Sequence, residues 1–307
     1  MPTLRAAIRV TGLVLMFQAD PHVLVAQVRA PGTDPVTSDP PRPDSANPAS
    51  SAELEIESMG ARMNGLFYLA SGSGPHPVVI LLHGLPGNER NLDLAQAIRR
   101  AGGNVLFFSY RGAWGSGGRF SFANSLEDVA AAVHFVRSDE SVQQYHSDPG
   151  RVVLLGHSMG GWLAILGAAA DSGIKCTGAL DYWNVGSDGR VLRADTREDS
   201  LLTAYVNWLI ARGGPLQAES GRTLTAEIKE HAEAWDVDSS ASALRSRPVL
   251  LISTTANPYH ATLIAALDSA GARKVTAVTW KSDHSFSALR IKLARTVVQW
   301  LRRSCGL

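Results

Sequence analysis

Residues 151–167, RVVLLGHSMGGWLAILG, constrain the fold more than any other stretch of this 307-residue chain. The apolar run at 152–155 predicts a buried strand, and the small and apolar residues from position 159 onward predict a helix. The turn between them, GHSMG, fits the pattern G-x-S-x-G and places Ser158 where small neighbours let the backbone turn tightly. Such a turn exposes the serine hydroxyl beside helix N–H groups that can stabilise an oxyanion, although a serine here can also simply cap the helix.

Apolar runs and helical patterns alternate along the rest of the chain. Continuous apolar runs predict further strands at 77–82, 104–110, 174–180, 248–253 and 274–280. Helical spacing predicts helices at 91–101, 125–136, 261–270 and 291–301. Alternating apolar positions at 54–69 predict a hairpin. This order is typical of an α/β fold with a doubly wound, mostly parallel sheet.

The composition narrows the possible partners. Hydrophobic residues make up 45% of the chain and charged residues 19%, with a net charge of +1, so neither nucleic acid nor a membrane surface is an expected partner. The two cysteines, Cys176 and Cys305, have no C-x-x-C spacing, so we expect no metal site, and nothing implies an organic cofactor. A disulfide between them requires the C-terminal tail to fold back onto Cys176, and we do not predict one.

The N-terminal residues resemble a targeting segment. Residues 1–26 combine two arginines, an apolar run at 10–17 and a possible cleavage site after Ala26, which predicts a signal peptide and an exported protein, periplasmic or secreted. An unstructured leader on a cytoplasmic protein is the alternative. The run is too short to span a membrane. The Pro- and Ser-rich residues 27–52 predict a disordered linker.

Three short motifs at strand ends together resemble the α/β-hydrolase superfamily. They are His-Gly after the strand at 77–82, GHSMGG around Ser158, and Asp-His-Ser-Phe at 283–286 after the last strand. The resemblance covers about residues 55–303. The Tyr-Arg-Gly loop at 110–112 looks most like the prolyl-oligopeptidase-type and dienelactone-hydrolase-type branches.

The resemblance implies roles for particular residues. Ser158 corresponds to the nucleophile and His284 to the catalytic histidine. The oxyanion hole would consist of the backbone N–H groups of Leu85, after the His-Gly dipeptide, and Met159, after the nucleophile.

The catalytic acid is where the sequence departs from the superfamily pattern. The usual carboxylate follows the strand at 248–253, and Asn257 stands there instead. An asparagine supplies no charge and can select the wrong histidine tautomer. We take Asp181, at the end of the preceding strand, as the acid. Asn257 in its place remains an alternative. A third possibility is a carboxylate from the predicted cap, Asp199 or Asp236. Asp283 is disfavoured because neighbours in an extended loop point apart and it directly precedes His284.

Residues 185–247 interrupt the rhythm of strands and helices. Helical patterns at 201–211 and 224–234 predict a helical cap inserted into a core formed by residues 53–184 and 248–303. Caps of this kind exclude water and shape substrate choice. Tyr110 and Trp114, on a glycine-rich loop, are candidates for lining the substrate cleft.

These features predict a serine hydrolase that cleaves a carboxylic ester or related acyl bond of a small-molecule substrate through an acyl-enzyme. The alternative is a non-catalytic or weakly active ligand-binding protein of the same fold, which is suggested by Asn257 at the usual acid position.

Overall fold

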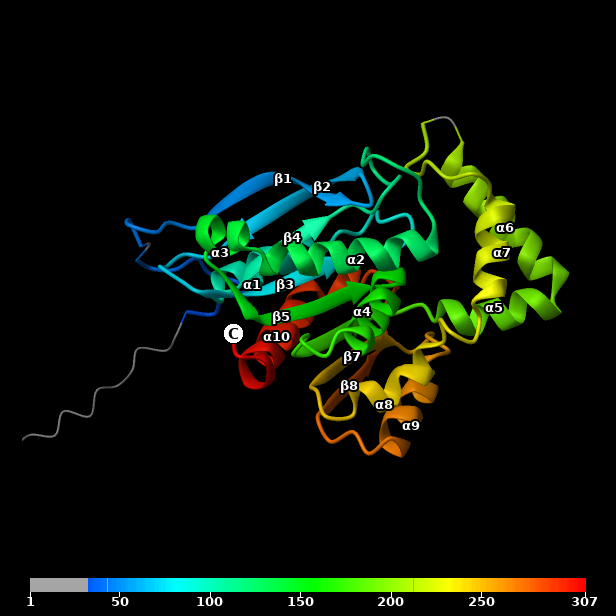
Figure 1. The fold of residues 1–307 in the computed structure, drawn as a ribbon. Helices are drawn as coiled ribbons and strands as arrows, with labels where there is room; N and C mark the ends of the chain where they lie inside the picture. The colour runs from blue at the N-terminus through cyan, green and yellow to red at the C-terminus, as the bar shows by residue number, and fades with distance from the viewer. Residues whose placement is uncertain (1–32, 43, 212) are drawn as a thin grey trace, which may run out of the picture. The chain divides into compact units, whose positions relative to one another are not determined.

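A central eight-stranded sheet organises the described part of the chain (Figure 1). The computed structural model describes residues 33–307 except positions 43 and 212, so the predicted signal peptide at 1–26 lies outside the described residues. The strands are β1 (Ser50–Ser58), β2 (Ala61–Leu69), β3 (His76–Leu82), β4 (Asn104–Phe108), β5 (Ser147–His157), β6 (Cys176–Leu180), β7 (Val249–Thr254) and β8 (Val275–Trp280). Their order is β1-β2-β4-β3-β5-β6-β7-β8, with β3 to β8 parallel and the β1–β2 hairpin antiparallel. The predicted fold class is confirmed.

Helices cover both faces of this sheet and create two apolar cores. Helices α1 (Leu92–Arg100) and α10 (Arg290–Trp300) pack on one face. Helices α2 (Phe122–Arg137), α4 (Met159–Ala170) and α9 (His260–Ser269) pack on the other, with the short α3 (Asp139–Tyr145) and α8 (Ala241–Leu244) beside them. Every residue of β3 is buried because both of its faces are covered, which explains why this strand reads as a continuous apolar run.

Three helices form the segment after β6, and Figure 1 shows them beyond the carboxyl ends of the strands. They are α5 (Val185–Ala194), α6 (Thr196–Ile210) and α7 (Gly221–Glu230); the sequence pattern indicated the last two and missed α5. The Glu227 carboxylate of α7 accepts hydrogen bonds from the backbone N–H groups of Phe122 (2.9 Å) and Ala123 (3.0 Å). Helix α7 therefore supplies an anionic cap for the N-terminus of α2.

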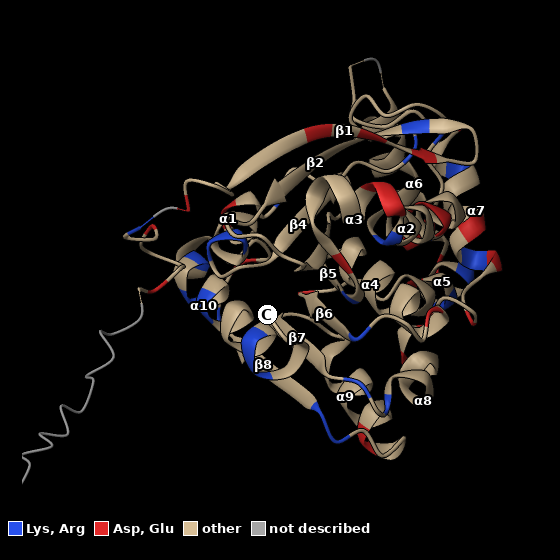
Figure 2. Cartoon of the chain, turned by 60° about the vertical axis from the view of Figure 1, so that its left-hand side comes forward, with Lys and Arg blue, Asp and Glu red and all other residues tan. Residues whose placement is uncertain are grey.

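Acidic and basic residues lie close together along α5 and α7, as Figure 2 shows. Arg193 of α5 pairs with Glu233 at 2.5 Å, and Lys229 of α7 pairs with Asp199 of α6 at 2.8 Å. These partly exposed pairs contribute little stability each, but they join neighbouring helices.

The structure differs from the predicted disordered linker over part of its length. Residues 50–52 belong to β1. Further upstream, Asp34 forms an ion pair with Arg295 of α10 at 2.6 Å, and Val36 packs against the core beneath α1 and α10. Asp34 and Val36 contact residues that are distant in sequence, so the local composition could not predict these contacts.

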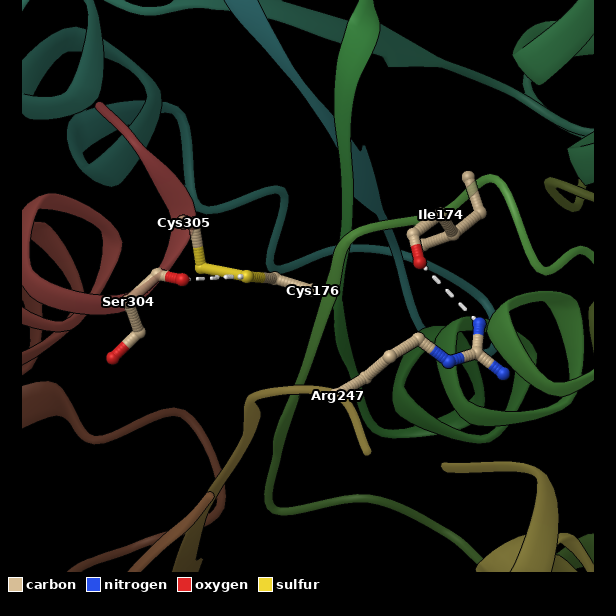
Figure 3. The surroundings of a disulfide bond; sticks show 5 residues. All are labelled: Ile174, Cys176, Arg247, Ser304 and Cys305. Carbon is tan, nitrogen blue, oxygen red and sulfur yellow. Dashed lines mark hydrogen bonds between the residues drawn. A yellow bond between two sulfur atoms is a disulfide. The ribbon is translucent and has the colours of Figure 1, made fainter. Parts of the chain in front are cut away.

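A disulfide joins Cys176, the first residue of β6, to Cys305 near the C-terminus (Figure 3). The expectation of no disulfide was therefore wrong. The chain returns beside the start of β6 after α10, which brings the two Cα atoms to 5.9 Å. Sequence spacing could not reveal this approach. On another side of the same segment, Arg247 donates a hydrogen bond to the Ile174 carbonyl (3.3 Å), so the entry into β6 is held from two directions.

Removal of this disulfide is expected to destabilise the fold. The bond joins residues 129 positions apart, and closing so long a loop removes much of the conformational entropy of the unfolded chain. We expect the double variant C176A/C305A to lose about 2–5 kcal/mol of unfolding free energy. Urea denaturation of oxidised, reduced and variant protein measures this loss. An unchanged midpoint in the variant would contradict a structural role for the bond.

In the part of the chain that the structure describes, no helix is both long and apolar enough to cross a bilayer. The same residues contain no group of three or more His, Cys, Asp or Glu side chains arranged to hold a metal ion.

Candidate active site

Ser158 occupies the sharp turn between β5 and α4. Its φ of 59° and ψ of −123° lie in a region that residues other than glycine rarely adopt. The flanking glycines allow the turn: a Cβ at Gly156 would lie 1.9 Å from the Gly160 oxygen, and one at Gly160 would lie 2.2 Å from the Leu82 oxygen. The spacing G-x-S-x-G therefore follows from the close approach of the backbone to itself and to β3.

Backbone hydrogen bonds connect this turn to the end of β6. The Ser158 N–H donates to the Leu180 carbonyl at 3.0 Å, and the Trp183 N–H donates to the Ser158 carbonyl at 3.1 Å. Asp181 stands between these two partners. The serine turn and the aspartate turn are therefore held in a fixed relation by the backbone alone.

His284, in the loop after β8, contacts Asp181 directly. Its Nδ1 donates to Oδ2 of the carboxylate at 2.6 Å. The Asp181 side chain is only 5% exposed, whereas that of His284 is 54% exposed. With Nδ1 as the donor, Nε2 of the neutral ring is left free to accept a proton.

The Asp181 carboxylate is held as an anion by its surroundings. Its second oxygen, Oδ1, accepts hydrogen bonds from the Thr254 N–H (2.8 Å) and from Nδ2 of Asn257 (3.1 Å). Burial alone would raise the pKa of Asp181, but the hydrogen bonds from His284, Thr254 and Asn257 outweigh it and leave this pKa below its ordinary value.

Asn257 therefore contacts the aspartate rather than standing in for it. Its Nδ2 also donates to the Tyr182 carbonyl (2.9 Å), and its Oδ1 accepts from the Tyr259 N–H (3.0 Å). All three bonds fix the amide orientation, so that its NH₂ group points at Asp181. The loop that usually carries the acid here supplies a hydrogen-bond donor to the acid.

The remaining candidate acids are engaged elsewhere. Asp199 pairs with Lys229, and Asp236 pairs with Arg190 at 2.5 Å. The Asp283 carboxylate accepts a hydrogen bond from the Ser287 N–H at 2.7 Å. Among the residues that the structure describes, Asp181 is the carboxylate hydrogen-bonded to His284.

Two other histidines brace the site without facing solvent. Nδ1 of His83 bonds to the Gly84 carbonyl at 2.8 Å, and Nε2 of His157 bonds to the His284 carbonyl at 2.8 Å. Burial lowers the pKa of both His83 and His157 to about 4, so both rings are neutral at pH 7. They position the loops that carry Leu85 and His284.

These two histidines predict an acid-labile fold. Their folded pKa of about 4 lies below the ordinary value of 6.5, so unfolded chains bind more protons between these values. Stability is then fully present above about pH 6.5 and falls as the pH drops toward 4, by about 2 kcal/mol per histidine between pH 7 and pH 5. Urea denaturation at the two pH values measures this fall. His157→Gln, which keeps a donor near the Nε2 position but cannot titrate, should show a smaller fall; an equal fall would contradict the assignment.

The proposed oxyanion donors come from two elements next to Ser158. Met159 is the first residue of α4, and Leu85 lies on the loop after β3. A Cβ added at Gly84 would lie 2.8 Å from the Ser158 Cβ, so this loop presses against the serine. Within the described residues, neither the Leu85 nor the Met159 N–H donates a hydrogen bond. Both donors are therefore available to an oxygen bound beside Ser158.

The expected role of Tyr110 in the cleft is wrong. Its side chain is fully buried, and its hydroxyl donates to the His83 carbonyl at 2.9 Å. Arg111, the next residue, forms a buried ion pair with Asp128 that pulls the loop down onto α2. Tyr110 therefore supports the Leu85 loop from below.

Trp114 is half-buried and lies beside a different cavity. Its indole N–H donates to the Pro86 carbonyl at 2.5 Å, and with Trp208 it lines a space of about 360 Å³ that Ser158 does not reach. The expectation that it lines the cleft around Ser158 is therefore not met.

The cleft residues that the sequence did not indicate come mainly from α5 and α6. We call this space the cap cavity; it measures about 480 Å³, and Ser158 is one of its lining residues. Its apolar lining residues are Leu85, Trp183, Val191, Leu192, Leu202 and Tyr205. The sequence pattern indicated α6 but not α5, and which of these residues face the serine depends on how the helices pack.

Comparison with known proteins places this geometry in context. The model of the alpha/beta hydrolase family matches residues 79–300. A curated protein from the traX-finO intergenic region of Escherichia coli, itself uncharacterized, is 34% identical over 150 residues, which are 47% of this chain and 49% of that protein. The chain spans about a third to a half of the length of the curated relatives it matches.

Two solved structures share the fold at low sequence identity. The 2,6-dihydroxy-pseudo-oxynicotine hydrolase has a TM-score of 0.61 and 19% identity, covering 85% of this chain and 69% of that chain. The Pyrococcus furiosus esterase Pf2001 has a TM-score of 0.56 and 16% identity, covering 88% of this chain and all of that chain.

Proposed function

Because the chain belongs to the alpha/beta hydrolase family, we propose that it is a serine hydrolase that cleaves carboxylic ester bonds of small molecules. The observation that carries this proposal is the 2.6 Å contact between His284 and a buried, anionic Asp181, tied by the backbone to the Ser158 turn. Nucleophilic acyl transfer requires a nucleophile, a base and a carboxylate that orients the base. Here Ser158 is partly exposed and lines two cavities together with His284.

In the proposed reaction, Ser158 Oγ attacks the ester carbonyl carbon while Nε2 of His284 takes the hydroxyl proton. The negative oxygen of the tetrahedral intermediate accepts hydrogen bonds from the N–H groups of Leu85 and Met159. His284 then gives its proton to the leaving alcohol oxygen as the ester C–O bond breaks. Water repeats the sequence on the acyl-enzyme and releases the carboxylic acid. Asp181 holds the ring tautomer and stabilises the imidazolium throughout.

The proposal is tested by covalent labelling and turnover. Purified protein is incubated with a fluorophosphonate probe, and peptide mass spectrometry then locates the adduct; we expect it on Ser158. The same preparation should hydrolyse short p-nitrophenyl esters. If neither labelling nor turnover is detected between pH 6 and pH 9, the hydrolase proposal fails. A ligand-binding role then becomes the better explanation. The sequence suggested that role because Asn257 stands at the usual acid position, but the contact between Asp181 and His284 removes this argument.

We propose in addition that the protein is exported. Two independent features support this: the signal-like residues 1–26 and the disulfide between Cys176 and Cys305, a bond that persists mainly in oxidising compartments. Cell fractionation followed by intact-mass measurement tests it. The expected product lacks the first residues, lies outside the cytoplasm and is two hydrogens lighter than its reduced form. A full-length, reduced cytoplasmic protein would contradict export.

A further inference from the structure

Ser158 lies where three cavities meet. The cap cavity, of about 480 Å³, is lined by the serine but not by His284. Two other cavities contain both Ser158 and His284: one of about 450 Å³ beside Asn257 and Tyr259, and one of about 180 Å³ beside the loop that starts at Gly84. We call these two the histidine-side cavities.

The position of His284 decides which part of a substrate each cavity receives. In ester cleavage the leaving oxygen must take a proton from this ring, so the alcohol part has to lie on the histidine side. The acyl part then extends away from His284. From this we infer, on the basis of the proposed serine hydrolase activity, that the cap cavity binds the acyl chain and selects extended apolar acyl groups.

The chemistry of the cap cavity supports an apolar occupant. Its walls are mostly aliphatic and aromatic side chains. Asp188 also borders it, but both carboxylate oxygens are occupied: Oδ2 accepts from the Trp183 indole N–H and Oδ1 from the Tyr259 hydroxyl, each at 2.6 Å. This carboxylate therefore holds the wall in place. Together with Glu198 at the exposed rim, it disfavours acyl chains that end in a negative charge.

The outer wall of the cap cavity leaves room for a chain of some length. Val191 of α5 and Tyr205 of α6 line the cavity and yet remain 47% and 42% exposed, so the space opens between these helices. Leu201 and Trp208, on the same helix as Tyr205, are 54% and 69% exposed. A chain that outgrows the cavity would leave it between α5 and α6, past the apolar side chains of Val191 and Tyr205.

A pair of isomeric esters tests the inference. Ethyl octanoate and octyl acetate have the same atoms, but they carry the long chain on the acyl side and on the alcohol side, respectively. Each buried methylene favours the transition state by roughly fourfold, so kcat/KM for ethyl octanoate should exceed that for octyl acetate by at least about tenfold. Both rates are measured by pH-stat titration below the solubility limits, with the oxidised protein.

Variants locate the effect within the cap cavity. Leu202→Trp, which fills the cavity, should lower kcat/KM for ethyl octanoate by at least about tenfold and change ethyl acetate by less than about threefold. Val191→Trp is a second filling variant at a half-exposed position, which tolerates size without disturbing the core. Ala256→Trp adds the same bulk beside a histidine-side cavity and should leave the ratio between octanoate and acetate ethyl esters unchanged.

The outcomes separate this inference from the proposed activity. Acid release from neither isomer, together with no labelling of Ser158, means that the activity itself is absent. Two results would overturn the assignment of the acyl chain to the cap cavity. One is a preference for octyl acetate over ethyl octanoate. The other is a ratio between octanoate and acetate ethyl esters that changes in Ala256→Trp but not in Leu202→Trp or Val191→Trp.

Discussion

Replacing Ser158 with alanine is expected to lower kcat on p-nitrophenyl esters by about 10⁴- to 10⁶-fold and to abolish fluorophosphonate labelling. The substitution removes the only atom that can form the acyl-enzyme at this turn. The variant should keep the backbone conformation of the wild type, because the close packing around Gly84, Gly156 and Gly160 holds the turn at φ 59°. The loss should therefore be chemical rather than structural, and circular dichroism and urea midpoints check that the fold is retained.

His284→Ala provides the companion measurement. Since nucleophile and base act as a unit, the double variant should be about as slow as either single variant, not slower by the product of the two effects. Substantial turnover in Ser158→Ala would mean that ester cleavage occurs at another site or by direct attack of water, and the acyl-enzyme scheme would have to be abandoned.

The serine turn and the sheet could be predicted from the sequence because both depend on local patterns. Glycines at 156 and 160 flank a serine, and the buried strands read as unbroken apolar runs, so neither needs knowledge of distant contacts. The start of α2 shows where prediction from local patterns fails. It was predicted at Ser125, but Ser121 caps the helix through the Asn124 N–H, and Ser125 is buried within the first turn.

The acid was ambiguous for a different reason. Asp181 and Asn257 end neighbouring strands, β6 and β7, and the sequence makes either one a plausible partner for His284. Their roles separate only through the register of those strands and through the bonds that turn the Asn257 amide toward the carboxylate. The prediction for Tyr110 failed for a similar reason, because its burial depends on contacts distant in sequence: its hydrogen bond to the His83 carbonyl and the Arg111–Asp128 ion pair beside it.

Asp181→Asn is expected to lower kcat by about 10⁴-fold. The amide carries no charge to stabilise the imidazolium, and its NH₂ group can donate to Nδ1 and place the ring proton on Nε2, where it blocks proton transfer from Ser158. Asn257→Ala removes one of the hydrogen bonds that Oδ1 accepts and leaves the carboxylate in place. It should cost only about tenfold in kcat.

The matched control is Asp199→Asn, which makes the same chemical change at the α6–α7 ion pair and should alter kcat by less than about twofold. The three rates are compared with the same p-nitrophenyl ester at pH 8. If Asn257→Ala proved more damaging than Asp181→Asn, the oxygen that orients His284 would belong to the asparagine. The hydrogen bonds argue against that outcome, because Asn257 presents its NH₂ group, not its oxygen, to the aspartate that His284 contacts. The ratio of these two variants therefore measures how much of the activity depends on an anion, rather than a neutral acceptor, beside the ring.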